Sequence, residues 1–320
     1  MIIALCVLGV AIVAVAVWAL LGGSETLSTK FKESQHKEVI IYEGKEYRYN
    51  DHLSNYLFLG IDTKEAIKGH DVAGDAGQAD AIFLVSYDRV KKTVRCLSIP
   101  RDTMAQIHLF APDGTDLGYS KDHINIQYAF GDGKTKSCQL MKKAVETLLS
   151  DIRIDGYCAI NMDGIPAAVE QVGGVELVVP DDSLEAVNPE FKQGATAMIT
   201  KDNAEQFVRY RDITVSHSAS TRANRQKVFM KAFADTAKVR SAEDADLVVD
   251  MYESLKPYMV TNIGNDVFAK LLQAEPATEK IFEDIPGKRV DGINFDEYHI
   301  KEKDLYKLVL QMFYEEAKSK

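Results

Sequence analysis

An uncharged apolar run at the start of the chain predicts that the rest of it folds beside a membrane. Residues 2–21 contain no Asp, Glu, Lys or Arg. A helix of about 20 residues, rising about 1.5 Å per residue, matches the roughly 30 Å hydrocarbon core of a bilayer. The run lacks both the basic start and the small-residue exit site of a cleavable signal peptide. We therefore expect residues 1–22 to form a single transmembrane anchor.

The remaining sequence suits one sizeable globular domain with attachments. Of the 320 residues, 46% are hydrophobic and 27% are charged, which is enough apolar material for a substantial core. We expect a polar stalk over residues 23–53, a main domain over 54–256, and a strand-and-helix extension over 257–320. The stalk should hold a short strand or two near residues 39–42 and 47–49.

Charge and cysteine usage exclude several classes of function. A net charge of -10 would repel nucleic acid, so any anion site has to be built locally and no nucleic-acid partner is expected. The four cysteines form no CxxC pair, which argues against a zinc site or a redox motif. We expect the three cysteines beyond the anchor to be packing residues, although an exported domain could also pair them.

Three short apolar runs predict central strands of a sheet. They cover residues 56–61, 81–85 and 94–99, and each is bounded by polar or turn residues. Helical spacing follows from Cys138 to Leu149, and strands then alternate with helices. This order predicts an α/β fold, a layered α/β/α domain with a central mixed sheet, preceded by the transmembrane helix.

Acidic and basic residues stand where these strands end. Asp62 follows the first strand, Asp80 precedes the second and Arg101 follows the third. The turn over residues 88–92 is too short for a parallel crossover, so the second and third strands should form a hairpin. That hairpin places Asp80 and Arg101 at one end, and Asp62 joins them if the first two strands are antiparallel. Any one of these residues alone would be explained as a solvated strand end.

Two arginine pairs follow later in the chain. Arg209 and Arg211 would share one side of an extended segment, whereas on a helix they would diverge. Arg222 and Arg225 continue the apolar stripe of a helix capped by Ser220 or Thr221, so both should point inward. A buried arginine suits a bidentate phosphate contact or a structural ion pair, and the residues alone do not decide between them.

Six segments in this order resemble the LytR-CpsA-Psr family, and the match covers roughly residues 54–235. They are N-Y-L-F-L-G-I-D (55–62), G-Q-A-D-A-I-F-L-V-S (77–86), L-S-I-P-R-D-T (97–103), G-G-V-E-L-V-V-P (173–180), A-E-Q-F-V-R-Y-R (204–211) and R-A-N-R-Q (222–226). The resemblance implies a single-pass membrane protein whose catalytic domain lies outside the cytoplasm. It would transfer a glycopolymer (teichoic acid, capsular or other wall polysaccharide) from a polyprenyl pyrophosphate to peptidoglycan through a phosphodiester, with the lipid tail in a hydrophobic tunnel.

The resemblance also implies roles for particular residues. The catalytic set is Asp62, Asp80 and Arg101, and the two aspartates are expected to hold Mg²⁺. The residues expected to bind the pyrophosphate are Arg101, Arg209, Arg211, Arg222, Arg225 and Gln78. Gln78 stands where the family usually has arginine, and Lys64 could partly replace the missing charge. Asp102 is expected to brace the loop.

Two other functions fit the same residues. One is a membrane-bound polyprenyl pyrophosphate hydrolase that uses water as the acceptor. The other is a regulator that binds polyprenyl phosphates without turnover, which would agree with the loss of a charge at Gln78.

Overall fold

The computed structural model describes residues 39–212, 214–215, 218–279, 281–290 and 296–317. The predicted anchor, residues 1–22, and the predicted stalk up to residue 38 lie outside these ranges. Within the described ranges, no helix is both long enough and apolar enough to cross a bilayer.

The described part of the chain begins with a series of strands, and helices and strands are interspersed from residue 124 onward. The strands are β1 (Ile40–Tyr42), β2 (Lys45–Tyr49), β3 (Leu53–Ile61), β4 (Ala79–Asp88), β5 (Thr93–Ser98), β6 (Met104–Phe110), β7 (Asp116–His123), β8 (Gly156–Asn161), β9 (Val175–Val178), β10 (Thr196–Ile199), β11 (Met259–Thr261), β12 (Glu275–Pro276), β13 (Phe282–Asp284), β14 (Gly287–Val290), β15 (Glu297–Ile300) and β16 (Tyr314–Glu316). The helices are η1 (Ile124–Phe130), α3 (Thr135–Leu148), α4 (Gly164–Gln171), α5 (Ala204–Arg209), α6 (Ser218–Glu243), α7 (Leu247–Leu255), η2 (Lys256–Tyr258), α8 (Asn265–Gln273) and α9 (Glu302–Phe313).

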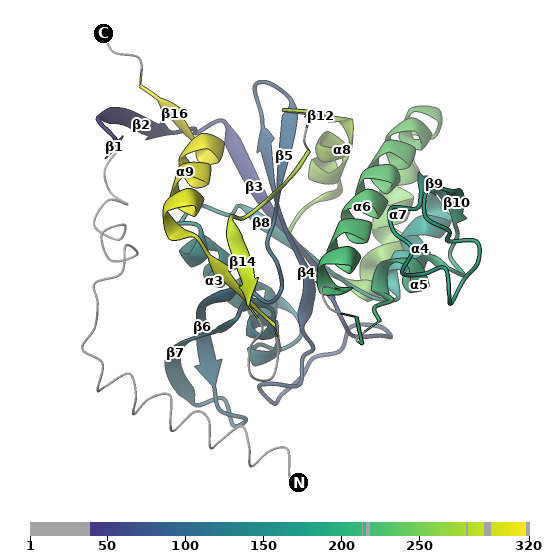
Figure 1. Ribbon diagram of the computed structural model, residues 1–320, viewed down its shortest axis with the longest axis horizontal. Coiled ribbons are helices and arrows are strands. Elements are labelled where there is room, and N and C mark those ends of the chain that lie inside the picture. Colours follow the sequence, from purple (N-terminus) through teal and green to yellow (C-terminus); the bar gives the residue numbers. More distant parts are fainter. Residues whose placement is uncertain (1–38, 213, 216–217, 280, 291–295, 318–320) are drawn as a thin grey trace.

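A mixed sheet forms the centre of the molecule (Figure 1). Its strand order is β11-β8-β3-β4-β5-β12, and β13 also pairs with β5. Strand β4 runs antiparallel to both β3 and β5, whereas β8 runs parallel to β3. The structure therefore confirms an α/β domain with a central mixed sheet, including the predicted hairpin.

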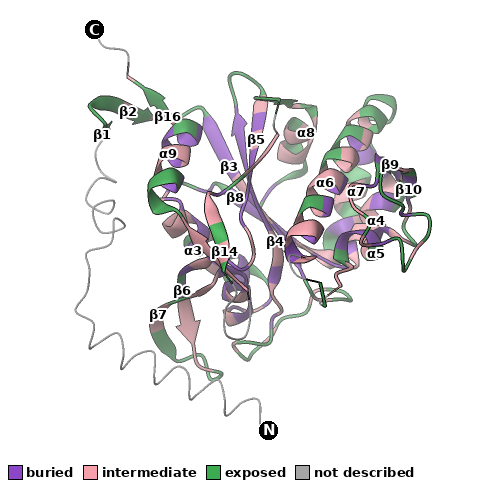
Figure 2. Cartoon of the chain, in the orientation of Figure 1, coloured by how far each residue is buried: buried purple, intermediate pink, exposed green. Residues whose placement is uncertain are grey.

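Helices cover both faces of this sheet, and alternate residues of each strand point to opposite faces. Leu57, Leu84 and Leu97 belong to the main core, in which Met141 of α3 and Val309 of α9 are also buried. Figure 2 shows the buried residues concentrated along the central strands. Helices α6, α7 and α8 lie on the opposite side of the sheet (Figure 1).

The segment after Lys256 is built into the same domain. It supplies β11, β12 and β13 to the central sheet, and β16 joins β1 and β2 in a smaller sheet. Ile285 and Phe313 are fully buried in the main core. The strands that we expected in the stalk are present as β1 and β2. The predicted extension, residues 257–320, thus contributes to the domain core.

A carboxylate holds the turn between β4 and β5. The backbone N–H groups of Val90 and Lys91 donate to Oδ1 of Asp88 at 2.9 and 2.8 Å. The register then pairs Asp88 with Thr93 and Phe83 with Ser98. This short turn brings the start of β4 and the end of β5 to one edge of the sheet.

The three cysteines beyond the predicted anchor are buried free thiols, Cys96, Cys138 and Cys158. Burial raises the pKa of Cys96 and of Cys138 to about 12. Such thiols remain protonated at neutral pH, which agrees with a packing role.

Candidate functional site

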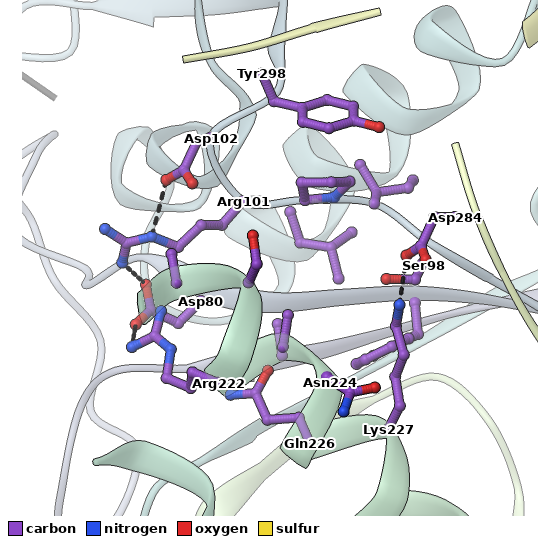
Figure 3. A pocket seen from close by; sticks show the side chains of 18 of the residues that line it. Asp80, Ser98, Arg101, Asp102, Arg222, Asn224, Gln226, Lys227, Asp284 and Tyr298 are labelled. Atoms are coloured by element: carbon purple, nitrogen blue, oxygen red, sulfur yellow. Dashed lines mark hydrogen bonds and ion pairs between the residues drawn. The ribbon is translucent and has the colours of Figure 1, made fainter. Parts of the chain in front are cut away.

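Two predicted carboxylates meet at the edge of the sheet. Because β3 and β4 are antiparallel, with Ile61 opposite Ala79, the chain places Asp62 and Asp80 close together. Asp80 is the second residue of β4, so it lies within the strand and not before it as the sequence predicted. Arg101 follows β5 at the same edge (Figure 3).

Asp80 binds two arginines that come from different elements. Its Oδ1 forms an ion pair with Nη1 of Arg101, and its Oδ2 lies 3.1 Å from Nη1 of Arg222 on α6. The side chains of Asp80 and Arg222 are only 12% and 10% exposed, so solvent screens this contact weakly. The prediction that Arg222 points inward is confirmed.

The arginines around Asp80 repel one another. Burial lowers the pKa of Arg222, and the nearby charges of Arg101 and Arg211 lower it further. Burial also opposes the charge of Arg101, but Asp80 and Asp102 outweigh this effect and raise its pKa. A bound anion would reduce this repulsion.

Two hydrogen bonds between the end of β3 and the residue before β4 position Asp62. Its Oδ1 accepts the backbone N–H of Gln78 at 2.7 Å, and its own N–H donates to the carbonyl of Gln78 at 3.1 Å. Gly77 makes this approach possible, because its φ is +81° and a Cβ there would lie 2.4 Å from Cγ2 of Thr63. Partial desolvation of the carboxyl raises the pKa of Asp62, and the charge of Asp80 adds to this effect.

The side chain of Gln78 is held by a residue that the sequence did not single out. Asn125, at the start of η1, donates from Nδ2 to Oε1 of Gln78 at 2.8 Å. Asn125 is 3% exposed, and its backbone N–H donates to the carbonyl of Arg101 at 3.3 Å. Gln78 therefore braces Asp62 and anchors Asn125.

A pocket of about 320 Å³ opens beside these charges, between the sheet and α6. Apolar side chains line much of it, including Phe83 of β4 and Ala223 of α6. The ion pair of Lys227 with Asp284 lies on another side of the pocket (Figure 3). The pocket thus combines a cationic edge with an apolar wall.

Arg209 and Arg211 do not share a face. Helix α5 extends through Arg209, so the extended conformation that we considered does not hold there. Arg209 binds Glu205 at 2.9 Å and is 49% exposed, whereas Nε of Arg211 donates to Ser218 at 3.1 Å. Of this pair, Arg211 is the one whose charge lowers the pKa of Arg222.

Lys64 also contacts the carboxylate of Glu205, at 2.8 Å. Its side chain is 51% exposed. Lys64 and Arg209 therefore share Glu205 as their acidic partner. Because exposed ion pairs are weak, breaking either one would cost little free energy.

Arg225 points inward as predicted, and its side chain is 1% exposed. Its guanidinium donates to the carbonyls of Phe207 and Tyr210 and to Oγ of Ser183, the last at 2.7 Å. It also pairs with Asp181 at 3.3 Å. Arg225 thus fastens the end of α5 to α6, while Arg222 on the same helix faces the pocket.

Helix α6 begins at Ser218, earlier than the cap expected at Ser220 or Thr221.

A further arginine reaches the site from the carboxy-terminal part of the chain. Nη1 of Arg289 on β14 lies 2.6 Å from Oδ2 of Asp102, whose Oδ1 accepts from Nε of Arg101 at 3.1 Å. Asp102 is expected from the sequence to brace the loop, and in the structure its carboxylate braces the side chain of Arg101. Nothing in the sequence around Arg289 marks it, because the contact joins residues 187 positions apart.

Two carboxylates at this edge form at most an incomplete magnesium site, which substrate oxygens would have to complete. Magnesium in phosphoryl-transfer sites commonly uses one or two carboxylates together with substrate phosphates. Asp62 forms no ion pair with any described residue, whereas both oxygens of Asp80 bind arginines, so Asp80 would have to release an arginine to bind the ion. The described ranges contain no cluster of three or more His, Cys, Asp or Glu residues that could hold a metal by itself.

Comparison with known proteins supports the resemblance seen in the sequence. The sequence pattern of the LytR_cpsA_psr family matches residues 21–312. The polyisoprenyl-teichoic acid--peptidoglycan teichoic acid transferase TagV of Bacillus subtilis (strain 168) is 27% identical over 278 residues, which cover 84% of this chain and 61% of TagV. TagU of Halalkalibacterium halodurans, with the same activity in its name, is 31% identical over 195 residues, or 61% of this chain and 57% of TagU. The chain thus spans about six-tenths of the length of these relatives.

Solved structures show the same fold. The crystal structure of B. subtilis TagV superposes with a TM-score of 0.62 at 26% identity, covering 82% of this chain and 96% of that chain. TagT bound to LI-WTA superposes with a TM-score of 0.60 at 20% identity, covering 82% and 90%. At 20% identity this second likeness concerns the fold alone.

Proposed function

Because the chain belongs to the LytR-CpsA-Psr family, we propose that it transfers a glycopolymer from a polyprenyl pyrophosphate carrier to peptidoglycan through a phosphodiester. The polymer is a teichoic acid, a capsular polysaccharide or another wall polysaccharide. The relatives named above are teichoic acid transferases, and the chain shares their fold. We further propose that residues 1–22 anchor the protein in the cell membrane and that the catalytic domain lies outside the cytoplasm.

One observation carries this proposal: mutually repelling arginines stand at the edge of a pocket with an apolar wall. Arg101 and Arg222 share Asp80 and are both largely withdrawn from solvent. Their planar forks suit phosphate oxygens, which they can bind in pairs of parallel hydrogen bonds. A ligand with an anionic head and an apolar tail satisfies both parts of the pocket. A polyprenyl pyrophosphate has that chemistry.

The apolar wall would hold the first isoprene units of the carrier. Phe83 and Ala81 of β4 face the pocket from the sheet, and Ala219 and Ala223 of α6 face it from the opposite side. Small side chains on the helix leave room between helix and sheet. Burial of each lipid CH₂ contributes about 0.8 kcal/mol, so a few isoprene units would bind firmly.

The charged residues would direct the transfer. An acceptor hydroxyl of peptidoglycan attacks the phosphorus next to the glycopolymer, a new O–P bond forms, and the bond to the polyprenyl phosphate breaks. Arg101 and Arg222 hold the phosphate oxygens, where charge builds up in the transition state. Asp62 and Asp80 would hold a magnesium ion, which would supply charge neutralisation on the pyrophosphate oxygens.

When it is freed from tight contact with the metal, Asp62 is the better placed of the two aspartates to take the hydroxyl proton. Both oxygens of Asp80 are engaged by arginines, whereas Oδ1 of Asp62 accepts only a backbone N–H. General-base catalysis requires a carboxylate that can approach the hydroxyl.

The other arginines would take outer positions. Arg211 follows α5, donates to Ser218 at the start of α6 and lies near enough to Arg222 to bind the same phosphate group. Arg209 and Lys64 share Glu205, and either cation could turn from it toward the polymer. Arg225 would contribute by holding α5 against α6 behind Arg222.

A purified transfer assay tests the proposal. The full chain is incubated with a lipid-linked donor, peptidoglycan oligomer and magnesium, and the products are separated by mass. Polymer bound to glycan is the expected product. Free polymer would identify a hydrolase, and tight donor binding without turnover would identify a binding regulator; either result would overturn the transferase proposal.

A further inference from the structure

We propose that Arg289, on the carboxy-terminal hairpin, is a positioning residue that aligns Arg101 for anion binding through the shared carboxylate of Asp102. The substrate named for this site rests on the proposed function, but the alignment itself is a property of the anion site and can be tested with inorganic pyrophosphate.

Asp102 is divided between two arginines. Its Oδ2 accepts from Nη1 of Arg289 at 2.6 Å, and its Oδ1 accepts from Nε of Arg101 at 3.1 Å. The side chain of Asp102 is 8% exposed, and a carboxylate buried to this degree has to be paired and hydrogen-bonded. Each oxygen is therefore fixed by one guanidinium.

This division decides which atoms of Arg101 face the pocket. With only one carboxylate oxygen available to it, Arg101 binds Asp102 through Nε and reaches Asp80 through Nη1. Without Arg289, Asp102 would have a free oxygen and could rotate to bind Arg101 through both oxygens. The guanidinium would then turn away from Asp80 and from the place of the phosphate. Orienting partners of this kind are known to affect a site without touching its ligand.

Arg289 is itself held in place from several sides. Its Nε donates to Oγ of Ser220 on α6 at 2.8 Å, and its guanidinium carbon lies 5.9 Å from the ring centre of Tyr298. The N–H of Tyr298 donates to the carbonyl of Asp102 at 2.8 Å, and its hydroxyl donates to the carbonyl of Ile285 at 2.6 Å. Arg289 thus connects the loop after β5 with the helix that carries Arg222 (Figure 3 shows Tyr298 and Asp102 above Arg101).

The alternative role for Arg289 is direct contact with the ligand, because it lines the pocket. Its Nη1 and Nε atoms are already engaged by Asp102 and Ser220, which favours the positioning role. The two roles predict different pyrophosphate affinities for a variant in which both Arg289 and Asp102 are changed. Direct contact predicts additive losses of affinity, and positioning predicts losses that are not additive.

The test measures pyrophosphate affinity per folded molecule by calorimetry on the full chain, well below each variant's melting temperature. Arg289→Gln should weaken binding about tenfold, as is typical when an orienting partner is lost. Arg289→Lys should recover part of this loss, because it can still bind Asp102 but cannot also reach Ser220. Combining Arg289→Gln with Asp102→Asn should add little to the loss seen with Asp102→Asn alone.

Glu283→Gln is the matched control. Glu283 pairs with Arg95 of β5 at the other end of the same strand, and the two side chains are 24% and 23% exposed. That variant loosens a carboxy-terminal contact of the same kind, away from the anion site. Its pyrophosphate affinity should equal that of the unchanged chain, and a loss equal to that of Arg289→Gln would mean that Arg289 matters only for stability.

The outcomes separate this inference from the proposed function. Unchanged pyrophosphate affinity in Arg289→Gln overturns the inference and leaves the transferase proposal standing. Fully additive losses in the double variant also overturn it, in favour of direct contact. No pyrophosphate binding by the unchanged chain overturns it as well. Arg289-dependent binding by a chain that does not transfer polymer supports the inference and overturns the proposed function.

Discussion

Arg222 on α6 reaches Oδ2 of Asp80 on β4 at 3.1 Å, and this ion pair joins the helix to the sheet beside the pocket. The other oxygen of the same carboxylate binds Arg101. Asp80 therefore holds both guanidinium groups at the place where phosphate oxygens would bind. A bound anion would replace Asp80 as a partner of these two arginines.

Neutralising Asp80 should make the chain unstable until an anion binds. In Asp80→Asn the two arginines lose their shared counter-charge, and breaking a buried pair costs up to about 3–5 kcal/mol. We expect a lower melting temperature without ligand and a larger upward shift with pyrophosphate than in the unchanged chain. Asp235→Asn, which breaks an exposed pair on α6, is the control. Equal pyrophosphate shifts in Asp80→Asn and the parent would show that Asp80 does not hold the arginines in the anion site.

Arg101→Lys should be harmful although it keeps the charge. A lysine has a single nitrogen and cannot reproduce the planar fork with which Arg101 binds Asp102 through Nε and Asp80 through Nη1. Losing a charge-assisted hydrogen bond of about 1.5–3 kcal/mol corresponds to a roughly tenfold to hundredfold slower transfer. The transfer rate at saturating donor measures this effect, with melting curves to confirm equal folding. A rate close to normal would mean that Arg101 supplies only a general positive field.

The local signals in the sequence were sufficient to predict this edge of the sheet. The short turn at residues 88–92 required a hairpin, and the hairpin placed Asp80 beside Arg101. Helical periodicity placed Arg222 and Arg225 inward, and both are buried. Each of these inferences depended on the pattern within one segment of the chain or on contacts between segments that follow one another in the sequence.

Contacts between distant segments could not be predicted in the same way. The role of Arg289 depends on how the last part of the chain packs against the loop after β5, and Gly-Lys-Arg-Val has no pattern that marks a site. The direction of the Arg209 side chain could not be predicted for another reason. The same Arg-Tyr-Arg segment could be extended or helical, and the structure places Arg209 in the last turn of α5.

The turn that sets this edge should depend on pH through Asp88. Burial alone would raise the pKa of Asp88, but hydrogen bonds from Lys91 and Val90 outweigh it and hold the pKa below its usual value. A carboxylate with a lowered folded pKa contributes stability above its unfolded pKa and loses that contribution as the pH falls through the folded pKa. The free energy of unfolding of Asp88→Asn should therefore lie below that of the parent at pH 7. The two values should converge below about pH 3.8, the pKa of an unperturbed Asp; a gap independent of pH would contradict this account.

Gln78→Arg should strengthen pyrophosphate binding and weaken the fold. The new guanidinium would add positive charge beside Asp62, as in the usual family pattern. The buried Asn125 would lose its acceptor, at a cost of about 1–3 kcal/mol. Gln78→Leu is the matched control, because it removes the same acceptor without adding charge and should weaken only the fold. If both variants bind pyrophosphate as the parent does, position 78 lies outside the anion site.

The two arginines of α6 should respond differently to removal, although the sequence placed them on one face. Arg225 is 1% exposed and donates to two carbonyls, to Ser183 and to Asp181. Arg225→Ala would strand these groups and should lower the free energy of unfolding by about 3–5 kcal/mol. Pyrophosphate affinity per folded molecule should change little.

Arg222→Ala should show the opposite behaviour. Arg222 is disfavoured by burial and by the charges of Arg101 and Arg211, while Asp80 keeps Arg101 as a partner when Arg222 is removed. Its loss should therefore cost less than about 1 kcal/mol of stability, within the range of many single substitutions, and should weaken pyrophosphate binding clearly. Urea unfolding and calorimetry on both variants, with the 53%-exposed Arg240 changed to alanine as the control on the same helix, separate the two effects. A stable Arg225→Ala variant that no longer binds pyrophosphate would place Arg225 in the anion site beside Arg222, because a purely structural arginine cannot be removed without loss of stability.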